Sequence, residues 1–222
     1  MNDEAAVTGI VLSVQPIGEY DKRLVLLTKE LGKISAFAKG ARRPNSPLVA
    51  AGRLFACGDF VLYEGRSSYT VKSARIGEFF DYLSDDVEAM CYASYFGELA
   101  DHFCRENVPA GREIKLLYFA IRALRLPQLS RHLVKRVYEL KLLALEGEYF
   151  PEPRTQAGDS ARYAWDYVLK APLEKLYTFT LEEESFREFS LAVGDMMAYF
   201  VDREFRSLKV LEDMNALMGG KV

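Results

Sequence analysis

Residues 21–43 read DKRLVLLTKELGKISAFAKGARR and predict a β-hairpin followed by a cationic turn. Residues 24–28 are almost continuously apolar, which is typical of a strand buried on both faces. Residues 33–38 alternate polar and apolar side chains, as the return strand of a hairpin does. Gly32, between the two runs, is the residue that can take the positive φ of a tight turn.

Strand patterns on both sides extend this hairpin into a larger sheet. Residues 7–18 are rich in β-branched side chains and end at Pro16 and Gly18, and residues 59–65 and 68–79 form a second hairpin. Because four to five short strands follow one another within about 75 residues, with glycine-marked turns, the pattern predicts a small closed β-barrel.

From Ser84 onward the apolar period changes from that of a strand to that of a helix. Breaks at Pro109, Pro127 and Gly147 separate the first helices, which we expect from Ser84, over 112–126 and over 130–146. A polar loop, 147–161, precedes further helices over 161–171, 181–201 and 205–217. The fold class is therefore α+β, with an N-terminal five-stranded β-barrel domain over residues 1–80 and an all-helical C-terminal domain over residues 81–222.

Composition indicates an ordinary globular protein: 222 residues, 50% hydrophobic and 27% charged. The three cysteines, Cys57, Cys91 and Cys104, do not form a disulfide pattern and predict reduced thiols. Neither an apolar run of about 18 residues nor a signal sequence appears. We therefore expect a soluble, cytoplasmic protein without membrane contact.

The charge is distributed unevenly although the formal net charge is only −3. Residues 1–80 contain 11 basic and 8 acidic side chains, a net of +3, so residues 81–222 contain 18 basic and 24 acidic ones, a net of −6. Residues 31–58 contain five basic side chains and no carboxylate. Such a stretch favours an anionic partner, although a solvated loop would look the same.

The residues of catalytic and metal sites do not occur at useful spacings. Cys91 and Cys104 lie outside any paired-cysteine motif, and His102 and His132 are far apart in the sequence, so we expect no zinc site and no other cofactor. His102 falls on the apolar stripe of its helix and is expected in the core. The acids at 85–86 and 182–184 lie at predicted helix starts, where the helix dipole favours them. With no nucleophile elbow or phosphate-binding loop, the chain is not expected to be an enzyme.

Cations and aromatic side chains occur together in the predicted barrel, and this combination is typical of proteins that bind single-stranded nucleic acid. The alternative for each aromatic residue is a place in the core. Phe55, Tyr63 and Tyr69 are further aromatic residues on later strands. The candidate nucleic-acid-binding residues are Tyr20, Lys22, Arg23, Lys33, Phe37, Lys39, Arg42, Arg43 and Arg53.

The first strand, the hairpin of residues 21–38 and the cationic turn after it resemble those of the bacterial DNA repair protein RecO family. The resemblance rests on Gly9-Ile10-Val11-Leu12, on Gly18-Glu19-Tyr20-Asp21-Lys22, and most specifically on Gly32-Lys33 followed by Lys39-Gly40-Ala41-Arg42-Arg43. Weaker similarity continues at Leu142-Leu143 and at Arg206-Ser207-Leu208-Lys209. The family implies an oligonucleotide/oligosaccharide-binding (OB) barrel followed by a helical domain.

The family also implies a recombination mediator in DNA repair. Such a protein binds single- and double-stranded DNA, anneals complementary strands and, with RecR, helps to load RecA on strands coated by single-strand-binding protein. Many members carry a four-cysteine zinc site after the segment that matches residues 147–153. Here the sequence continues RTQAGDSARYAW without a cysteine, so the resemblance does not extend to the metal.

The resemblance also implies a contact with the acidic tail of a single-strand-binding protein, which ends in an apolar residue. Such a tail needs an apolar groove edged by cations. Residues 122–138 contain five basic side chains and no acid, beside several leucines. The candidate partner-binding residues are Arg122, Arg125, Arg131, Lys135 and Arg136. The alternative is that the leucines are core and the cations a solvated helix face.

Two other functions remain open from the residues alone. An RNA-binding barrel would show the same charges and aromatic residues, because nothing here selects for or against a 2′-hydroxyl. A helical scaffold for protein contacts would carry the same C-terminal domain, with an incidental charge on the barrel.

Overall fold

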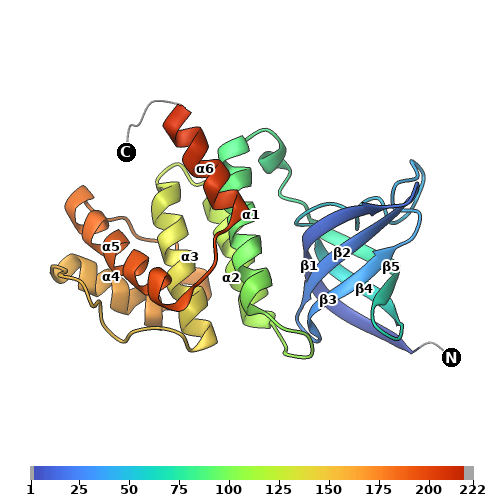
Figure 1. The fold of residues 1–222 in the computed structure, drawn as a ribbon, viewed down its shortest axis with the longest axis horizontal. Coiled ribbons are helices and arrows are strands. Elements are labelled where there is room, and N and C mark those ends of the chain that lie inside the picture. Colours follow the sequence, from blue (N-terminus) through green and yellow to red (C-terminus); the bar gives the residue numbers. More distant parts are fainter. Residues whose placement is uncertain (1–2, 218–222) are drawn as a thin grey trace. The chain divides into compact units, whose positions relative to one another are not determined.

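The computed structural model describes residues 3–217, with side chains as far as Met214, and begins with a closed five-stranded barrel (Figure 1). Its strands are β1 (Glu4–Ile17), β2 (Asp21–Thr28), β3 (Gly32–Ala38), β4 (Cys57–Glu64) and β5 (Tyr69–Glu78). Around the barrel they follow the order β1-β2-β3-β5-β4. The predicted barrel and the α+β fold class are thus confirmed, and the strand order is that of an OB-type barrel.

Strand β1 closes the barrel because it is long enough to pair with two neighbours. Its first half pairs antiparallel with β4 and its second half with β2, and a bulge between Val11 and Ser13 bends it between the two. A short parallel contact of β3 with β5, at Ala36 and Phe37, completes the ring. Inward side chains such as Leu24, Leu26 and Phe60 fill the interior.

The tip of the β2–β3 hairpin contacts residues that follow the first long helix. Lys33 N donates to Arg105 O at 3.1 Å, and Asn107 N donates to Leu31 O at 2.9 Å. Gly32 has φ +66°, and a Cβ at this position would lie 2.1 Å from Arg105 O. Only glycine therefore fits the tip without displacing this backbone.

The chain forms two compact units that alternate along the sequence. The barrel forms one unit together with Ala100–Ile114. Asp86–Leu99 and the chain from Lys115 onward form the other, which we call the helical unit. A domain boundary near residue 80 stays a prediction.

Helices follow the barrel, as the change of period predicts. They are α1 (Val87–Phe103), α2 (Gly111–Ala123), α3 (Arg131–Glu146), α4 (Asp159–Lys170), α5 (Glu183–Phe200) and α6 (Arg206–Leu217), with short 3-10 turns η1 (Asp81–Ser84) and η2 (Leu173–Lys175). Helix α2 ends three residues before the predicted Leu126, because the residue before Pro127 disfavours helical backbone angles.

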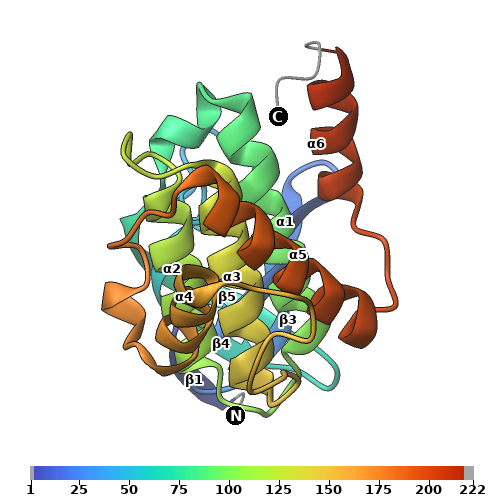
Figure 2. The ribbon, with the colours of Figure 1, turned by 90° about the vertical axis from the view of Figure 1, so that its left-hand side faces the viewer.

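Helix α3 runs through the middle of the helical unit, and α4 and α5 lie against it and against each other (Figure 2). Its ends match the sequence signals: Ser130 Oγ accepts a hydrogen bond from Leu133 N at 3.1 Å, and Gly147 ends the helix with φ 81°. Buried Trp165 and Phe189 fill the space between the helices.

The expected core position of His102 is wrong, because its side chain is exposed. His102 follows Leu99 by three residues, which places it about 60° around the helix from Leu99, away from the buried Ala100. Buried Cys104 occupies the inward position at the end of α1 instead. Among the helices of the described chain, none is long and apolar enough to span a membrane.

Candidate nucleic-acid interface

The outer face of β2 and β3 carries a cation and an aromatic ring directly opposite each other. Arg23 pairs with Phe37 across the two strands, and both side chains point away from the barrel because their neighbours Leu24 and Ala36 fill it. Arg23 is exposed, and its Nε donates to Ser35 Oγ at 2.9 Å. The guanidinium therefore stands beside a half-buried ring on an open sheet surface.

The β1–β2 turn and the chain after β3 lie side by side at one end of this face. Arg42 N donates to Tyr20 O at 2.9 Å, and the Arg42 guanidinium donates to Gly18 O at 3.0 Å. Arg43 lies over the Tyr20 ring, with its Cζ 4.7 Å from the ring centroid. These contacts gather the cations of the KGARR segment next to Tyr20.

A carboxylate fixes the turn that starts this cationic segment. Asp21 Oδ1 accepts a hydrogen bond from Gly40 N at 2.7 Å, and Gly40 has φ +69°, which favours glycine. Tyr20 also interacts with its neighbour Glu19: a hydrogen bond between them, with a smaller effect of burial, raises the pKa of the phenol. The Tyr20 hydroxyl therefore stays protonated at neutral pH.

Four of the predicted residues are exposed cations without an acidic partner among the described side chains. No carboxylate of residues 3–214 forms an ion pair with these side chains, Arg23, Lys39, Arg42 and Arg43. Other cations of the barrel are paired: Lys72 with Glu4, and Arg75 with Asp59. We call Tyr20, Arg23, Phe37, Lys39, Arg42 and Arg43 the barrel face.

Three predicted contact residues are already engaged inside the protein. The Lys22 ammonium donates to Gly52 O at 2.8 Å. Lys33 binds Asp101 through the backbone oxygen and the carboxylate. Arg53 forms an ion pair with Asp81 at 2.6 Å and lies over the Phe79 ring. These three side chains are held by partners within the protein, and their role in nucleic-acid binding stays a prediction.

The later aromatic candidates divide in the same way. Phe55 and Tyr69 are buried, with 1% and 8% of their surface exposed, so they belong to the core and cannot act as open platforms. Tyr63 is half-buried and covered by Lys72. Arg66, which the candidate set lacks, is exposed in the β4–β5 turn, one of the loops with which OB barrels bind oligonucleotides. The sequence feature that could have identified Arg66 is an arginine at a predicted hairpin turn.

Three of the five candidate partner-binding cations, all on α3, form ion pairs within the protein. Arg131 binds Asp86 and Glu88, which precede and begin α1. Lys135 and Arg136 both bind Glu139, at 2.9 and 2.8 Å. Arg122 and Arg125 are exposed. Leu124, Leu129, Leu133 and Val137 are buried, and Leu126 is half-buried.

Glu139 is a fully buried carboxylate among these cations. Burial raises its pKa, but Lys135, Arg136 and a 2.6 Å hydrogen bond from the Tyr95 hydroxyl outweigh this effect. The net result is a pKa below the ordinary value, and the carboxylate stays ionised in the core.

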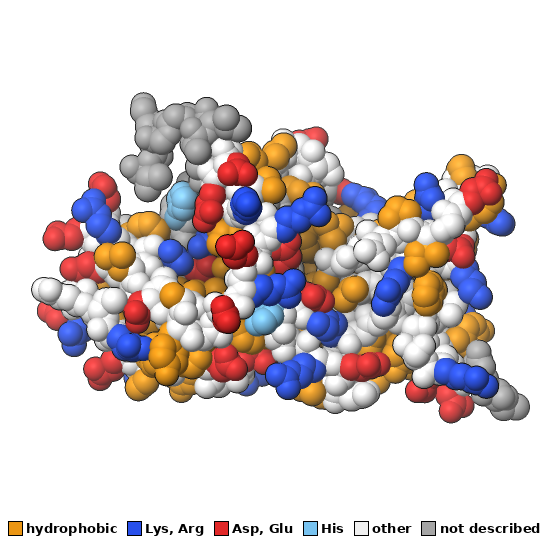
Figure 3. Space-filling view, viewed as in Figure 1, with side chains coloured by type: hydrophobic (Ala, Val, Ile, Leu, Met, Phe, Trp, Pro, Cys, Tyr) orange, Lys and Arg blue, Asp and Glu red, His pale blue; other side chains and the backbone are white. Residues whose placement is uncertain are grey.

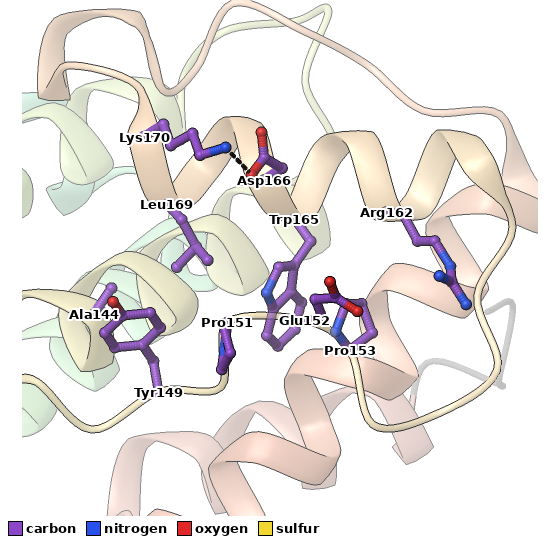
Figure 4. Close-up of a pocket in the computed structure, with 10 residues that line it drawn as sticks. All are labelled: Ala144, Tyr149, Pro151, Glu152, Pro153, Arg162, Trp165, Asp166, Leu169 and Lys170. Carbon is purple, nitrogen blue, oxygen red and sulfur yellow. Dashed lines mark ion pairs between the residues drawn. The ribbon is translucent and has the colours of Figure 1, made fainter.

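The helical unit also contains a pocket of about 530 Å³ beside the loop that follows Gly147. Figure 4 shows the Trp165 ring facing the prolines of this loop, with Tyr149 on one side and Arg162 farther out. Its rim carries two acids and two bases, of which Asp166 and Lys170 pair with each other. Neither cysteine nor histidine lines it, and residues 3–214 bring no three metal-ligating side chains together.

Comparison with known proteins covers both units of the chain. The family model described as "Recombination protein O N terminal" matches residues 1–80, and the one described as "Recombination protein O C terminal" matches residues 84–152. A DNA repair protein RecO from Alkaliphilus metalliredigens is 39% identical over 139 residues, which are 63% of this chain and 56% of the relative. The RecO of Acetivibrio thermocellus is 37% identical over 140 residues, with the same coverage.

The chain thus aligns with little more than half of the length of these two relatives. A third, the DNA repair protein RecO of Clostridium perfringens, is 26% identical over 235 aligned residues, which are 92% of this chain and 96% of the relative. Two successive family models in the order of the two predicted regions, an OB-type barrel followed by helices, and several relatives of one name agree: the chain belongs to the RecO family of DNA repair proteins.

Proposed function

We propose that the barrel face binds single- and double-stranded DNA and that the protein acts without catalysis, as a recombination mediator in cytoplasmic DNA repair. The observation that carries this proposal is the set of four unpaired cations beside Tyr20 and Phe37 on one barrel surface. Figure 3 supports it: over β2, β3 and β5, Lys and Arg side chains stand next to hydrophobic ones.

The two kinds of side chain supply different parts of the affinity. Arg23, Lys39, Arg42 and Arg43 attract phosphates, and each phosphate contact releases counterions from the nucleic acid. Phe37, and Tyr20 under Arg43, offer ring faces for unstacked bases at about 1–3 kcal/mol per base. A duplex keeps its bases stacked, so we expect it to engage the cations alone.

The test is a salt series of binding to fluorescent single-stranded DNA and RNA of one sequence. Changing Arg23, Lys39, Arg42 and Arg43 to Ala should lower the salt slope by about 3 on single strands, at roughly 0.7 per phosphate. The matched control changes Lys72 and Arg75 to Ala, because these barrel cations are already neutralised by Glu4 and Asp59. An unchanged slope in the folded quadruple variant refutes the barrel face.

The same series separates the alternative functions. Equal slopes with clearly tighter RNA binding would favour an RNA-binding barrel, and absence of binding to either nucleic acid would favour a scaffold for protein contacts. If DNA binding serves a mediator, the quadruple variant should also lose annealing of complementary strands in proportion to its lost affinity.

The family further supports proposals for protein partners: RecR, RecA indirectly, and the acidic tail of single-strand-binding protein. We place the tail at residues 122–136, where Arg122 and Arg125 are exposed. Tail carboxylates would have to compete with Asp86 and Glu88 for Arg131. They would have to compete with Glu139 for Lys135 and Arg136. This placement is tested by titrating a labelled tail peptide against wild type and the double variant Arg122→Glu, Arg125→Glu. Equal affinity for the two proteins would contradict it.

A further inference from the structure

A second groove of the helical unit lies between α4 and the segment that leads into α5. It has a volume of about 700 Å³ and is separate from the pocket beside Trp165, with which it shares no lining residue. The groove is lined by Asp159, Ser160, Tyr163, Ala164, Tyr167, Thr178, Phe179, Thr180 and Leu181.

Three aromatic rings form the walls of this groove. Tyr163 and Tyr167, one turn apart on α4, are nearly parallel, with their centroids 6.5 Å apart and an interplanar angle of 22°. Phe179 meets Tyr167 edge-on at 5.3 Å. The Tyr167 hydroxyl donates to Lys175 O at 2.8 Å and lies 3.2 Å from Thr178 Oγ1, so the central ring is fixed in place.

Within the part of the chain that the structure describes, cations lie over several other accessible aromatic rings but not over these three. Arg43 lies over Tyr20, Lys72 over Tyr63, and Arg154 over both Phe150 and Tyr199. No such cation lies over Tyr163, Tyr167 or Phe179 within the described side chains, although 74% of Tyr163 is exposed. Their faces are therefore available to a cation from outside the chain.

The charge of the groove selects the kind of partner. Asp159 is its charged lining residue, and neither lysine nor arginine lines it. Exposed Glu182 follows the lining residue Leu181 directly and exposed Glu184 comes two residues later, while Glu183 between them pairs with Arg187 at 3.4 Å. Carboxylates repel the phosphates of a nucleic acid and attract a guanidinium or an ammonium group. We propose that this groove binds a basic segment of a partner protein, with an arginine or lysine side chain laid on the tyrosine rings.

The test uses the full chain and a fluorescein-labelled peptide, Gly-Arg-Pro-Arg-Gly, titrated at low salt by fluorescence anisotropy. Saturable binding is expected, and replacing both arginines of the peptide with neutral citrulline should abolish it in the same concentration range. Tyr163→Ala should weaken binding about two- to fivefold, which corresponds to one exposed cation–π contact. Asp159→Asn should weaken peptide binding more than Tyr163→Ala does. Tyr149→Ala, an exposed tyrosine outside the groove, is the matched control and should bind like wild type.

Three results would overturn the proposal: no saturable binding of the arginine peptide, equal affinity for the citrulline peptide, or unchanged affinity in folded Tyr163→Ala. A fourth is binding of single-stranded oligothymidylate that is lost in Tyr163→Ala and kept in the barrel quadruple variant, which would assign the groove to nucleic acid. Because the groove and the barrel face share no residue, failure here leaves the proposed DNA binding untouched.

Discussion

We expect Lys22 to position the barrel face rather than to bind DNA directly, and the two roles can be distinguished by experiment. Its ammonium donates to Gly52 O at 2.8 Å, and its side-chain carbons pack on Gly52, where an added Cβ would lie 2.9 Å from Lys22 Cδ. Both contacts hold the long chain between β3 and β4, which begins with the cations Lys39, Arg42 and Arg43. We therefore expect Lys22 to act through this segment.

The perturbation is Lys22→Met, which keeps most of the side-chain volume and removes the charged donor. A hydrogen bond from a charged group contributes about 1.5–3 kcal/mol, and the carbonyl of Gly52 loses its side-chain donor. For a chain of this length that loss corresponds to a decrease in Tm of about 3–12 °C. The salt slope of DNA binding should stay at the wild-type value, because no phosphate contact is lost.

Lys39→Met is the comparison, because Lys39 is exposed and has no acidic partner among the described residues. Here the salt slope on single-stranded DNA should fall by about 0.7 and the Tm should stay unchanged. Thermal unfolding and a salt series, measured on both variants, give the result. The reasoning is refuted if Lys22→Met lowers the salt slope by about 0.7 while its Tm stays at the wild-type value.

Three further changes test how the structure is held together. Gly32→Ala should destabilise the barrel by more than the roughly 1–2 kcal/mol of a left-handed residue, because its Cβ would meet Arg105 O; chemical denaturation measures this, and a loss below about 1 kcal/mol would contradict the contact. Lys141→Met should cost about 2–4 kcal/mol, since the buried ammonium of Lys141 donates to three carbonyls at the end of α4; an unchanged denaturation midpoint would show that water replaces it. The pKa of buried Glu139 is lowered on folding, so its contribution to stability is present above its ordinary pKa of 4.5 and lost as the pH falls below it. Glu139→Gln should therefore flatten the fall of Tm in that acid range. Equal slopes of Tm against pH for variant and wild type would refute this.

The barrel could be predicted from the sequence because local pattern and long-range pairing agree there. The alternation over residues 33–38 and the apolar run over 24–28 indicate two paired strands, and Gly32 is at the position where the hairpin needs a positive φ. Ser130 and Gly147 likewise mark the ends of α3, where each residue makes the predicted cap. These features depend on residues close together in the chain.

Features that depend on distant residues could not be predicted in this way. Lys22 reads as an exposed cation, but the chain after β3 folds back and brings Gly52 O to its ammonium. Phe55 has the pattern of an accessible ring, but its side chain is buried and its backbone N donates to Val11 O at 2.9 Å, far away in the sequence. His102 has the spacing of a core residue, but it lies about 60° around α1 from buried Leu99, and its side chain is exposed.

Charge counted along the sequence and charge gathered in space differ most at α3. Residues 122–138 contain five bases and no acid, yet Arg131 meets Asp86 and Glu88 from the start of α1, and Lys135 and Arg136 meet Glu139, the residue after the window ends. At the KGARR segment the nearby carboxylate of Asp21 accepts from the Gly40 backbone, and the arginine side chains meet Gly18 O and the Tyr20 ring instead. An excess of cations indicates an anion-binding surface only where the packed elements pair no acid with the cationic side chains. This condition favours the barrel face over α3 as the surface for DNA.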